Sequence, residues 1–124
     1  MNKDKLKQKF HRASDSLLKD KNYITPVDLL ISMEILKDKD YKNWRLGLVP
    51  YLERVCNTNL KKLSFIMKKL REYAKNNDLK ESWTAYNRCG IKGKKIPLRF
   101  SKTGNPKIEK AYATHYVQKS KMKE

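Results

Sequence analysis

Cysteine and histidine are scarce in this 124-residue chain, which contains two residues of each. Cys56 and Cys89 stand alone in the sequence, so a disulfide framework is not expected. His11 and His115 lie in neither an HExxH nor an HxE frame, and no two of the four residues have the spacing of metal ligands. The sequence also spells out neither a nucleophile with its base nor a pair of catalytic carboxylates. It therefore predicts no metal, no cofactor and no enzyme.

Long hydrophobic runs are absent as well. No apolar run approaches the roughly 18 residues of a membrane span. The first ten residues, MNKDKLKQKF, lack the apolar core of a secretion signal. Binding to an anionic membrane surface would require bulky apolar side chains on a cationic helix face, and the candidate face has only Phe65. We therefore expect a cytoplasmic protein that does not bind membranes.

Acidic side chains are few, because 13 Asp and Glu stand against 30 Lys and Arg and leave a formal net charge of +17. Residues 80–124 hold +9 of this surplus. Such an excess destabilises the folded chain by self-repulsion, which a bound polyanion relieves. Nucleic acid is therefore the leading partner class, with DNA favoured over RNA, and an acidic protein is the alternative.

The apolar pattern predicts a single globular domain over residues 23–117, of the α+β class and mainly helical. Thr25-Pro26 and Asn105-Pro106 each combine a capping side chain with proline at the first helical position. Trp44 is expected to anchor the core. The predicted elements are four to six helices and one β-hairpin, namely helices 26–37, 41–46, 50–56, 60–75 and 106–117 and a hairpin over 84–101. In the hairpin, the residues expected to face the core are Ile96, Leu98 and Phe100, with Arg99 and Ser101 outside.

The two ends are predicted to be basic extensions of this domain. Residues 1–22 are rich in Lys, Asp, Gln and Ser and have a weak helical pattern in Leu6, Phe10 and Leu17. They predict a marginally helical arm, which either follows a phosphate backbone or, in the interpretation that we favour, is a disordered leader. Residues 118–124 predict a basic tail.

Residues 60–75 predict an amphipathic helix. Lys61 and Lys62 fall in its first turn, where cations oppose the helix dipole unless an anion binds there. Lysines that simply extend into solvent are the alternative. Apolar residues recur every three or four positions and define one face, namely Leu60, Leu63, Ile66, Met67, Leu70, Tyr73 and Ala74. The opposite face is cationic and holds Lys61, Ser64, Phe65, Lys68, Arg71 and Lys75.

Residues 50–77 resemble a helix-turn-helix. The packing, turn and capping positions of that motif match Leu52, Cys56, Asn57, Asn59, Leu63, Ser64, Met67 and Leu70. Glu53 and Thr58 depart from it, since the first position usually holds a small residue and the second an apolar one. A basic hairpin after the second helix is also the order of winged-helix proteins. The resemblance implies that the helix over 60–75 enters the major groove of duplex DNA, while hairpin lysines contact the flanking backbone.

A second resemblance covers most of the chain, from about residue 26 to residue 117. The segments WRLGLVPYLERV (44–55), SWTAY (82–86) and LRFSKTGNPKIEKAYATHYV (98–117) are similar to a small family of uncharacterised bacterial proteins of similar length. This resemblance implies a bacterial cytoplasmic origin and transfers no site residues.

The predicted interface combines two basic elements and requires that they converge in space. Lys61, Ser64 and Phe65 are the expected readers of base edges, and the remaining cations are expected to contact phosphates. The predicted nucleic-acid-binding residues are Lys61, Lys62, Ser64, Phe65, Lys68 and Arg71 on the helix and Lys92, Lys94, Lys95, Arg99 and Lys102 on the hairpin and its following turn.

The same residues are compatible with three other functions. Tyr86, Phe100 and Phe65 are candidates to stack on unpaired bases, which makes RNA or a single strand an alternative partner. A basic adaptor that docks on an acidic protein is another. A small enzyme acting on nucleic acid would need acids beside the basic face, and the spare candidates are Glu53, Glu72, Glu81 and Glu109.

Overall fold

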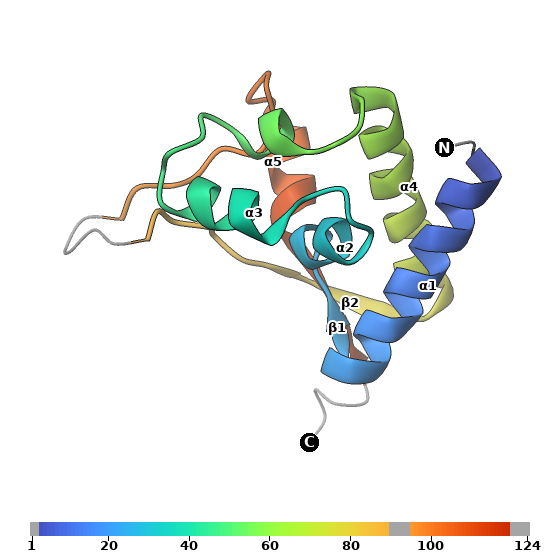
Figure 1. Cartoon of the computed structure of the whole chain (residues 1–124). Helices are drawn as coiled ribbons and strands as arrows, with labels where there is room; N and C mark the ends of the chain where they lie inside the picture. The colour runs from blue at the N-terminus through green and yellow to red at the C-terminus, as the bar shows by residue number, and fades with distance from the viewer. Residues whose placement is uncertain (1–2, 90–94, 120–124) are drawn as a thin grey trace.

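The computed structural model describes residues 3–89 and 95–119, which form an α+β fold that is mainly helical, as the sequence predicts (Figure 1). The helical elements in these residues are α1 (Lys3–Lys21), α2 (Pro26–Ser32), α3 (Asp38–Arg45), the 3-10 helix η1 (Leu52–Val55), α4 (Leu60–Asn76) and α5 (Pro106–Ala113). The strands are β1 (Tyr23–Ile24), β2 (Leu79–Trp83) and β3 (Thr114–Gln118). None of the described helices is long and apolar enough to cross a membrane.

The three strands form one antiparallel sheet in the order β1-β3-β2, with β3 in the centre. Successive side chains of a strand point to opposite faces of the sheet. Ile24, Leu79 and Tyr116 share one face and are buried, whereas Tyr23 and Lys80 lie on the other face and are exposed. The core therefore lies between the sheet and the helices, of which α2, α3, α4 and α5 stand above the sheet in Figure 1 and α1 runs down beside it on the right.

The predicted helix over 106–117 is wrong in its second half. α5 begins as predicted, with Asn105 as its cap, but it ends at Ala113 and β3 follows directly. Thr114 is β-branched and Tyr116 is aromatic, and both residue types favour strands. β3 also pairs along both of its edges, with β1 and β2. These pairings replace the continued helix, and β2 is an element that the prediction did not contain.

The predicted hairpin over 84–101 is reduced to one bridge in the described residues, between Asn87 and Pro97. Arg88 N–H donates to the carbonyl of Ile96 at 2.8 Å beside this bridge. Leu98 N–H donates to the carbonyl of Tyr86 at 2.8 Å on the other side of the bridge. Pro97 therefore occupies a position of this antiparallel pairing that requires no N–H donor. The two segments still run side by side, but they do not form long strands.

The alternation expected for the second hairpin segment also fails. Ile96 is exposed and Ser101 is buried, the reverse of the prediction, although Phe100 is buried as expected. Ser101 turns inward because its N–H and hydroxyl groups both donate to the carboxylate of Glu109. Residues 90–94, the predicted tip, lie outside the described residues.

Two predicted helix boundaries differ for local reasons. The helix predicted over 26–37 ends at Ser32, because Glu34 adopts a left-handed φ of 63° that terminates it. The helix predicted over 41–46 begins earlier, at Asp38, where acidic side chains in the first turn interact favourably with the helix dipole.

The predicted helix over 50–56 is only the four-residue 3-10 helix η1. Distant parts of the chain bind both of its ends. Leu52 N–H donates to the carbonyl of Arg99 at 3.1 Å, and Asn57 N–H donates to the carbonyl of Ile35 at 2.7 Å. Because Asn57 does not bond four residues back, the helical turn cannot continue.

The N-terminal segment is helical, as its weak apolar pattern predicts, but the 19-residue helix α1 packs on the core and is neither a marginal arm nor the disordered leader that the sequence favours. Leu6 and Phe10 are buried, and the rings of Phe10 and Tyr73 form a T-shaped pair with centroids 6.0 Å apart. The Tyr73 hydroxyl donates to the carboxylate of Asp15 at 2.6 Å and ties α1 to α4. Contacts with α2, β1 and α4, which the weak apolar pattern does not reveal, order this segment.

Trp44 anchors an aromatic cluster, as predicted. The Trp44 ring is fully buried, with ring centroids 5.7 Å from Tyr86 and 5.1 Å from Phe100. Phe100 in turn stacks on Tyr112 at 5.4 Å. The indole N–H donates to the carbonyl of Arg99 at 2.8 Å, which gives this buried donor its partner. The cluster therefore fastens the segment after the hairpin to α3 and α5.

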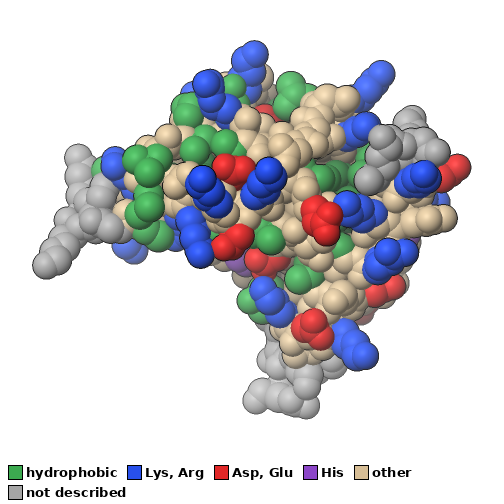
Figure 2. Space-filling view, viewed as in Figure 1, with side chains coloured by type: hydrophobic (Ala, Val, Ile, Leu, Met, Phe, Trp, Pro, Cys, Tyr) green, Lys and Arg blue, Asp and Glu red, His purple; other side chains and the backbone are tan. Residues whose placement is uncertain are grey.

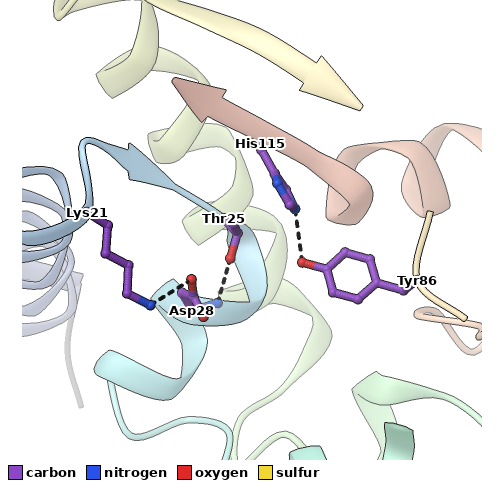
Figure 3. A network of polar contacts seen from close by, with 5 residues as sticks. All are labelled: Lys21, Thr25, Asp28, Tyr86 and His115. Carbon is purple, nitrogen blue, oxygen red and sulfur yellow. Dashed lines mark hydrogen bonds and ion pairs between the residues drawn. The ribbon is translucent and has the colours of Figure 1, made fainter. Parts of the chain in front are cut away.

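A polar contact fastens the first hairpin segment to β3 (Figure 3). His115 Nε2 lies 3.0 Å from the Tyr86 hydroxyl, and its Nδ1 lies 3.4 Å from Thr84 Oγ1. Burial lowers the pKa of His115 below its ordinary value, although the carboxylate of Asp28 acts in the opposite direction. Burial also raises the pKa of Tyr86 to about 12. Both rings are therefore neutral near neutral pH.

His115 should make the stability depend on pH. Its folded pKa is lowered, so below about pH 6.5 the unfolded chain takes up the proton first and the free energy of unfolding decreases. We expect His115→Gln to lack this decrease in the free energy of unfolding. The wild type should therefore be the more stable protein at about pH 7.5, and the difference between the two should shrink as the pH falls. Urea unfolding of both proteins from about pH 7.5 to about pH 5.5 measures the difference. Parallel stability curves for the two proteins would contradict the assignment.

Candidate nucleic-acid interface

The exposed side of α4 is the part of the predicted interface that is formed as expected. α4 spans Leu60–Asn76, one residue beyond the predicted range, and its first turn is capped where Lys62 N–H donates to Asn59 Oδ1 at 2.9 Å. The core face is buried as predicted, apart from the exposed Leu60. The side chains exposed along the opposite side are Lys61, Ser64, Lys68, Arg71 and Lys75.

Phe65 and Lys62 are less exposed than these five side chains. Phe65 is half-buried against the core, and Lys69 Nζ lies 5.5 Å from the centre of its ring. A phenyl ring in this position is covered on one side, so Phe65 is poorly placed to read a base edge. Lys62 is also half-buried.

A groove of about 330 Å³ lies between α4 and α5 and brings distant cations together. Arg71 lines it from α4, Lys107 from α5, and Lys102 from the turn before α5. The groove is lined at its base by Met67 and Tyr112. Lys102 therefore joins the α4 surface as predicted. Lys107 was not predicted, because only the packing of the two helices reveals its position.

Two carboxylates hold the turn that carries Lys102. Glu109 accepts hydrogen bonds from the N–H groups of Phe100 (2.8 Å) and Ser101 (2.7 Å) and from the Ser101 hydroxyl (2.6 Å). Glu53 accepts from Lys102 N–H at 3.0 Å and from the Tyr112 hydroxyl at 2.7 Å. Both acids were candidates for catalysis in the sequence. In the structure they bind backbone and hydroxyl donors and stabilise this turn.

Arg99 also acts within the turn. Its guanidinium donates to the carbonyls of Ser101 (2.8 Å) and Lys102 and lies over the ring of Tyr51. Gly104 has a left-handed φ of 72°, which suits glycine, although a Cβ there would make only an ordinary contact of 3.4 Å with Arg99 Nε. Arg99 is therefore bound to its own turn.

The hairpin does not bring its described cation to α4. Lys95 is exposed on a segment that extends to the left of Figure 1, whereas α4 stands on the right. Lys92 and Lys94 lie outside the described residues. Among the described residues, the predicted convergence of helix and hairpin is thus met by Lys102 alone.

Few cations of the described residues form ion pairs. The pairs within 4.0 Å in the described residues involve Lys9, Lys21, Lys42, Lys69 and Lys119. In the described part of the chain, Lys61, Lys68, Arg71, Lys102 and Lys107 form no such pair. Figure 2 shows basic side chains spread over the visible face with acidic ones between them. Arg12, Lys37 and Lys39 are likewise in none of these pairs, so neither missing ion pairs nor the density of charge singles out the α4 surface. It is distinguished by the groove that brings Arg71, Lys102 and Lys107 together from separate elements.

The residues considered for metal binding, thiol chemistry or base stacking are buried, half-buried or too far apart for these roles. Among residues 3–89 and 95–119, no group of three or more His, Cys, Asp or Glu is placed to hold a metal ion. Burial raises the pKa of Cys56 to about 12, which makes its thiol unreactive. Phe100 is buried and Tyr86 is half-buried, so these predicted stacking residues offer little free ring surface.

Comparison with protein-family models, with curated proteins and with solved structures finds no match to this chain in any of the three. The resemblances to a helix-turn-helix and to a bacterial family therefore stay predictions.

Glu109→Gln should destabilise the protein by about 2–4 kcal/mol, because hydrogen bonds to a charged acceptor are worth roughly 1.5–3 kcal/mol each and are not additive. Urea unfolding measures this loss, and hydrogen exchange should show faster exchange at the Phe100 and Ser101 amides. Glu81→Gln is the control, since Glu81 is exposed on β2 and should change the stability by less than about 0.5 kcal/mol. Equal effects of the two substitutions would contradict the role of Glu109.

Proposed function

We propose that this protein binds nucleic acid, with the exposed side of α4 and its groove with α5 against the sugar–phosphate backbone of duplex DNA. The observation that carries the proposal is the group of unpaired cations on two adjacent elements: Lys61, Lys68 and Arg71 on α4, Lys107 on α5, and Lys102 beside them. Each cation that neutralises a phosphate releases a bound counterion, and this release drives association.

Helix geometry favours DNA over duplex RNA. α4 has 17 residues and is about 25 Å long at 1.5 Å per residue. The major groove of B-DNA admits such a helix, whereas the major groove of duplex RNA is too narrow for side chains to read. Ser64 is the polar side chain of the exposed side that suits a base edge, and Arg71 and the lysines suit phosphates. Lys61 and Lys62 near the start of α4 add to the dipole and free N–H groups that favour a phosphate there.

Replacing Lys61, Lys68 and Arg71 together by glutamine should weaken binding to duplex DNA and reduce the slope of log K against log salt by about 2–3, at roughly 0.9 per phosphate contact. A matched variant removes the same charge from exposed positions on other elements, with Arg12, Lys37 and Lys39 replaced by glutamine. Fluorescence anisotropy from about 50 mM to about 200 mM salt measures both slopes.

The matched variant shows whether the loss of salt dependence is specific to the α4 surface. A larger loss of slope in the α4 variant supports the α4 surface. Equal losses in both variants would mean that the net charge of +17 acts without a defined surface and would overturn the proposal. Duplex RNA, single-stranded DNA and single-stranded RNA, run in the same series, rank the alternative nucleic acids.

A second candidate function is docking on an acidic protein segment. The same groove has two exposed apolar side chains at its edges, Leu60 at 53% and Ile108 at 40% exposure. Apolar edges next to Arg71, Lys102 and Lys107 suit an amphipathic helix with acidic residues, which lays its apolar face into a groove. Binding to phosphates alone would not involve these apolar side chains.

Replacing Leu60 and Ile108 together by serine separates the two candidates, because it removes apolar surface and leaves every cation in place. Under the nucleic-acid proposal, duplex affinity should change less than about threefold, since charge dominates that affinity. Under the adaptor candidate, capture of a protein partner should survive nuclease treatment and be lost in this variant. Nuclease-sensitive capture would exclude the adaptor.

A further inference from the structure

The most exposed aromatic side chain of the described residues is Trp83, at 63% exposure. It is the last residue of β2 and lies opposite Thr114 in the register. The next residue continues the pairing, since Thr84 N–H donates to the carbonyl of Ala113 at 3.1 Å. The backbone is therefore hydrogen-bonded on both sides of Trp83. This pairing keeps the indole ring at the surface when no ligand is bound.

Trp83 stands at the edge of a second groove, of about 590 Å³. Ala85, Pro97 and Leu98 of the hairpin segments line one part of it, and Phe100 lies deeper. The lining is mostly apolar. Two of the aromatic residues that the sequence offered for base stacking, Tyr86 and Phe100, thus line the same groove as Trp83, which the sequence did not single out.

Lys110 is the exposed charged side chain of this groove, because Glu109 keeps its negative charge but is half-buried and its oxygens are occupied by hydrogen-bond donors of the fold. Glu109 and Lys110 are its charged lining residues among those described. The Glu109 carboxylate already accepts hydrogen bonds from Phe100 N–H and from both polar groups of Ser101. Lys110 is exposed and, in the described part of the chain, forms no ion pair. A ligand that is both planar and apolar but carries a negative charge fits this combination.

α5 separates this groove from the groove along α4. Lys107 and Ile108 face the α4 groove, whereas Glu109 and Lys110 face the groove of Trp83. At about 100° per residue, the two sets of α5 positions lie on opposite sides of the helix. A strand whose backbone follows the cations of α5 therefore has an aromatic site within reach on the other side of the same short helix.

We propose that an unpaired base of the bound nucleic acid stacks on Trp83 in this groove, with its phosphate near Lys110. The inference rests on the proposed function and narrows its substrate to nucleic acid that has single-stranded segments. Every base has a flat face that stacks on an aromatic ring, whereas a base within a continuous duplex has no free face to offer. A purely apolar ligand would not use Lys110.

Tryptophan fluorescence tests the inference directly, because the chain has two tryptophans and Trp44 is fully buried in the core. A single strand of about ten nucleotides should quench Trp83 emission at low salt, and a blunt duplex of the same length should not. Trp83→Ala should weaken binding of the single strand about tenfold and leave duplex affinity unchanged. Trp83→Phe should restore part of the loss, because phenylalanine also stacks.

Leu48→Ala is the matched control, since Leu48 is exposed to a similar degree, at 68%, and lines neither groove. It should change neither affinity. Because Trp83 is exposed, its replacement should leave the midpoint of urea unfolding within the range of this control.

The possible results separate the two proposals. If no nucleic acid binds in any form, the proposed function fails and this inference fails with it. If single strands bind with a normal salt dependence but Trp83 emission and the Trp83→Ala affinity do not change, this inference alone is overturned. It is also overturned if Trp83 emission changes with protein concentration alone and sedimentation shows a dimer, because the groove would then be an interface between copies.

Discussion

The pairing of β3 with strands on both of its edges is the constraint on which the rest of the structure depends. A central strand needs partners for its N–H and C=O groups on each side, and β1 and β2 provide them from distant parts of the sequence. The chain therefore leaves the helical conformation at Ala113. That change of direction places α5 beside α4, sets Trp83 at the edge of its groove, and brings His115 against Tyr86.

The scarcity of acidic residues has a structural consequence. The chain has only 13 acids, and a carboxylate that accepts hydrogen bonds within the fold is not available to pair with a surface cation. Asp15 binds Tyr73, while Glu53 and Glu109 hold the turn before α5. The internal hydrogen bonds of these acids stabilise the fold, and Lys61, Lys68 and Arg71 of α4 and Lys107 of α5 are left without ion pairs among the described residues. Such a surface costs stability by self-repulsion in the free protein and favours a polyanion as partner.

The two grooves have different chemical character although α5 lines both. The groove along α4 combines cations with the apolar edges Leu60 and Ile108, whereas the groove of Trp83 is apolar with one available cation, Lys110. Under the proposed function the first contacts the backbone and the second an unpaired base. This division matches the general separation of contacts that position a nucleic acid from contacts that recognise its bases.

Local signals in the sequence determined the α+β class, the beginnings of α2, α4 and α5 at Thr25, Asn59 and Asn105, and the burial of Trp44. A helix cap and an apolar period are formed by residues close in sequence, so they can be recognised there.

Only the tertiary structure decided that Thr114–Gln118 is a strand, that η1 is one short turn, and that Lys107 lies across a groove from Arg71. For the candidate site, the sequence identified the exposed cations of α4 and Lys102 but neither Lys107 nor Trp83. In each of these cases the deciding contact joins residues far apart in the chain, such as Leu52 with Arg99 or Thr84 with Ala113. Hydrogen bonds of that kind depend on which segments meet in space, and no local pattern of side chains records them.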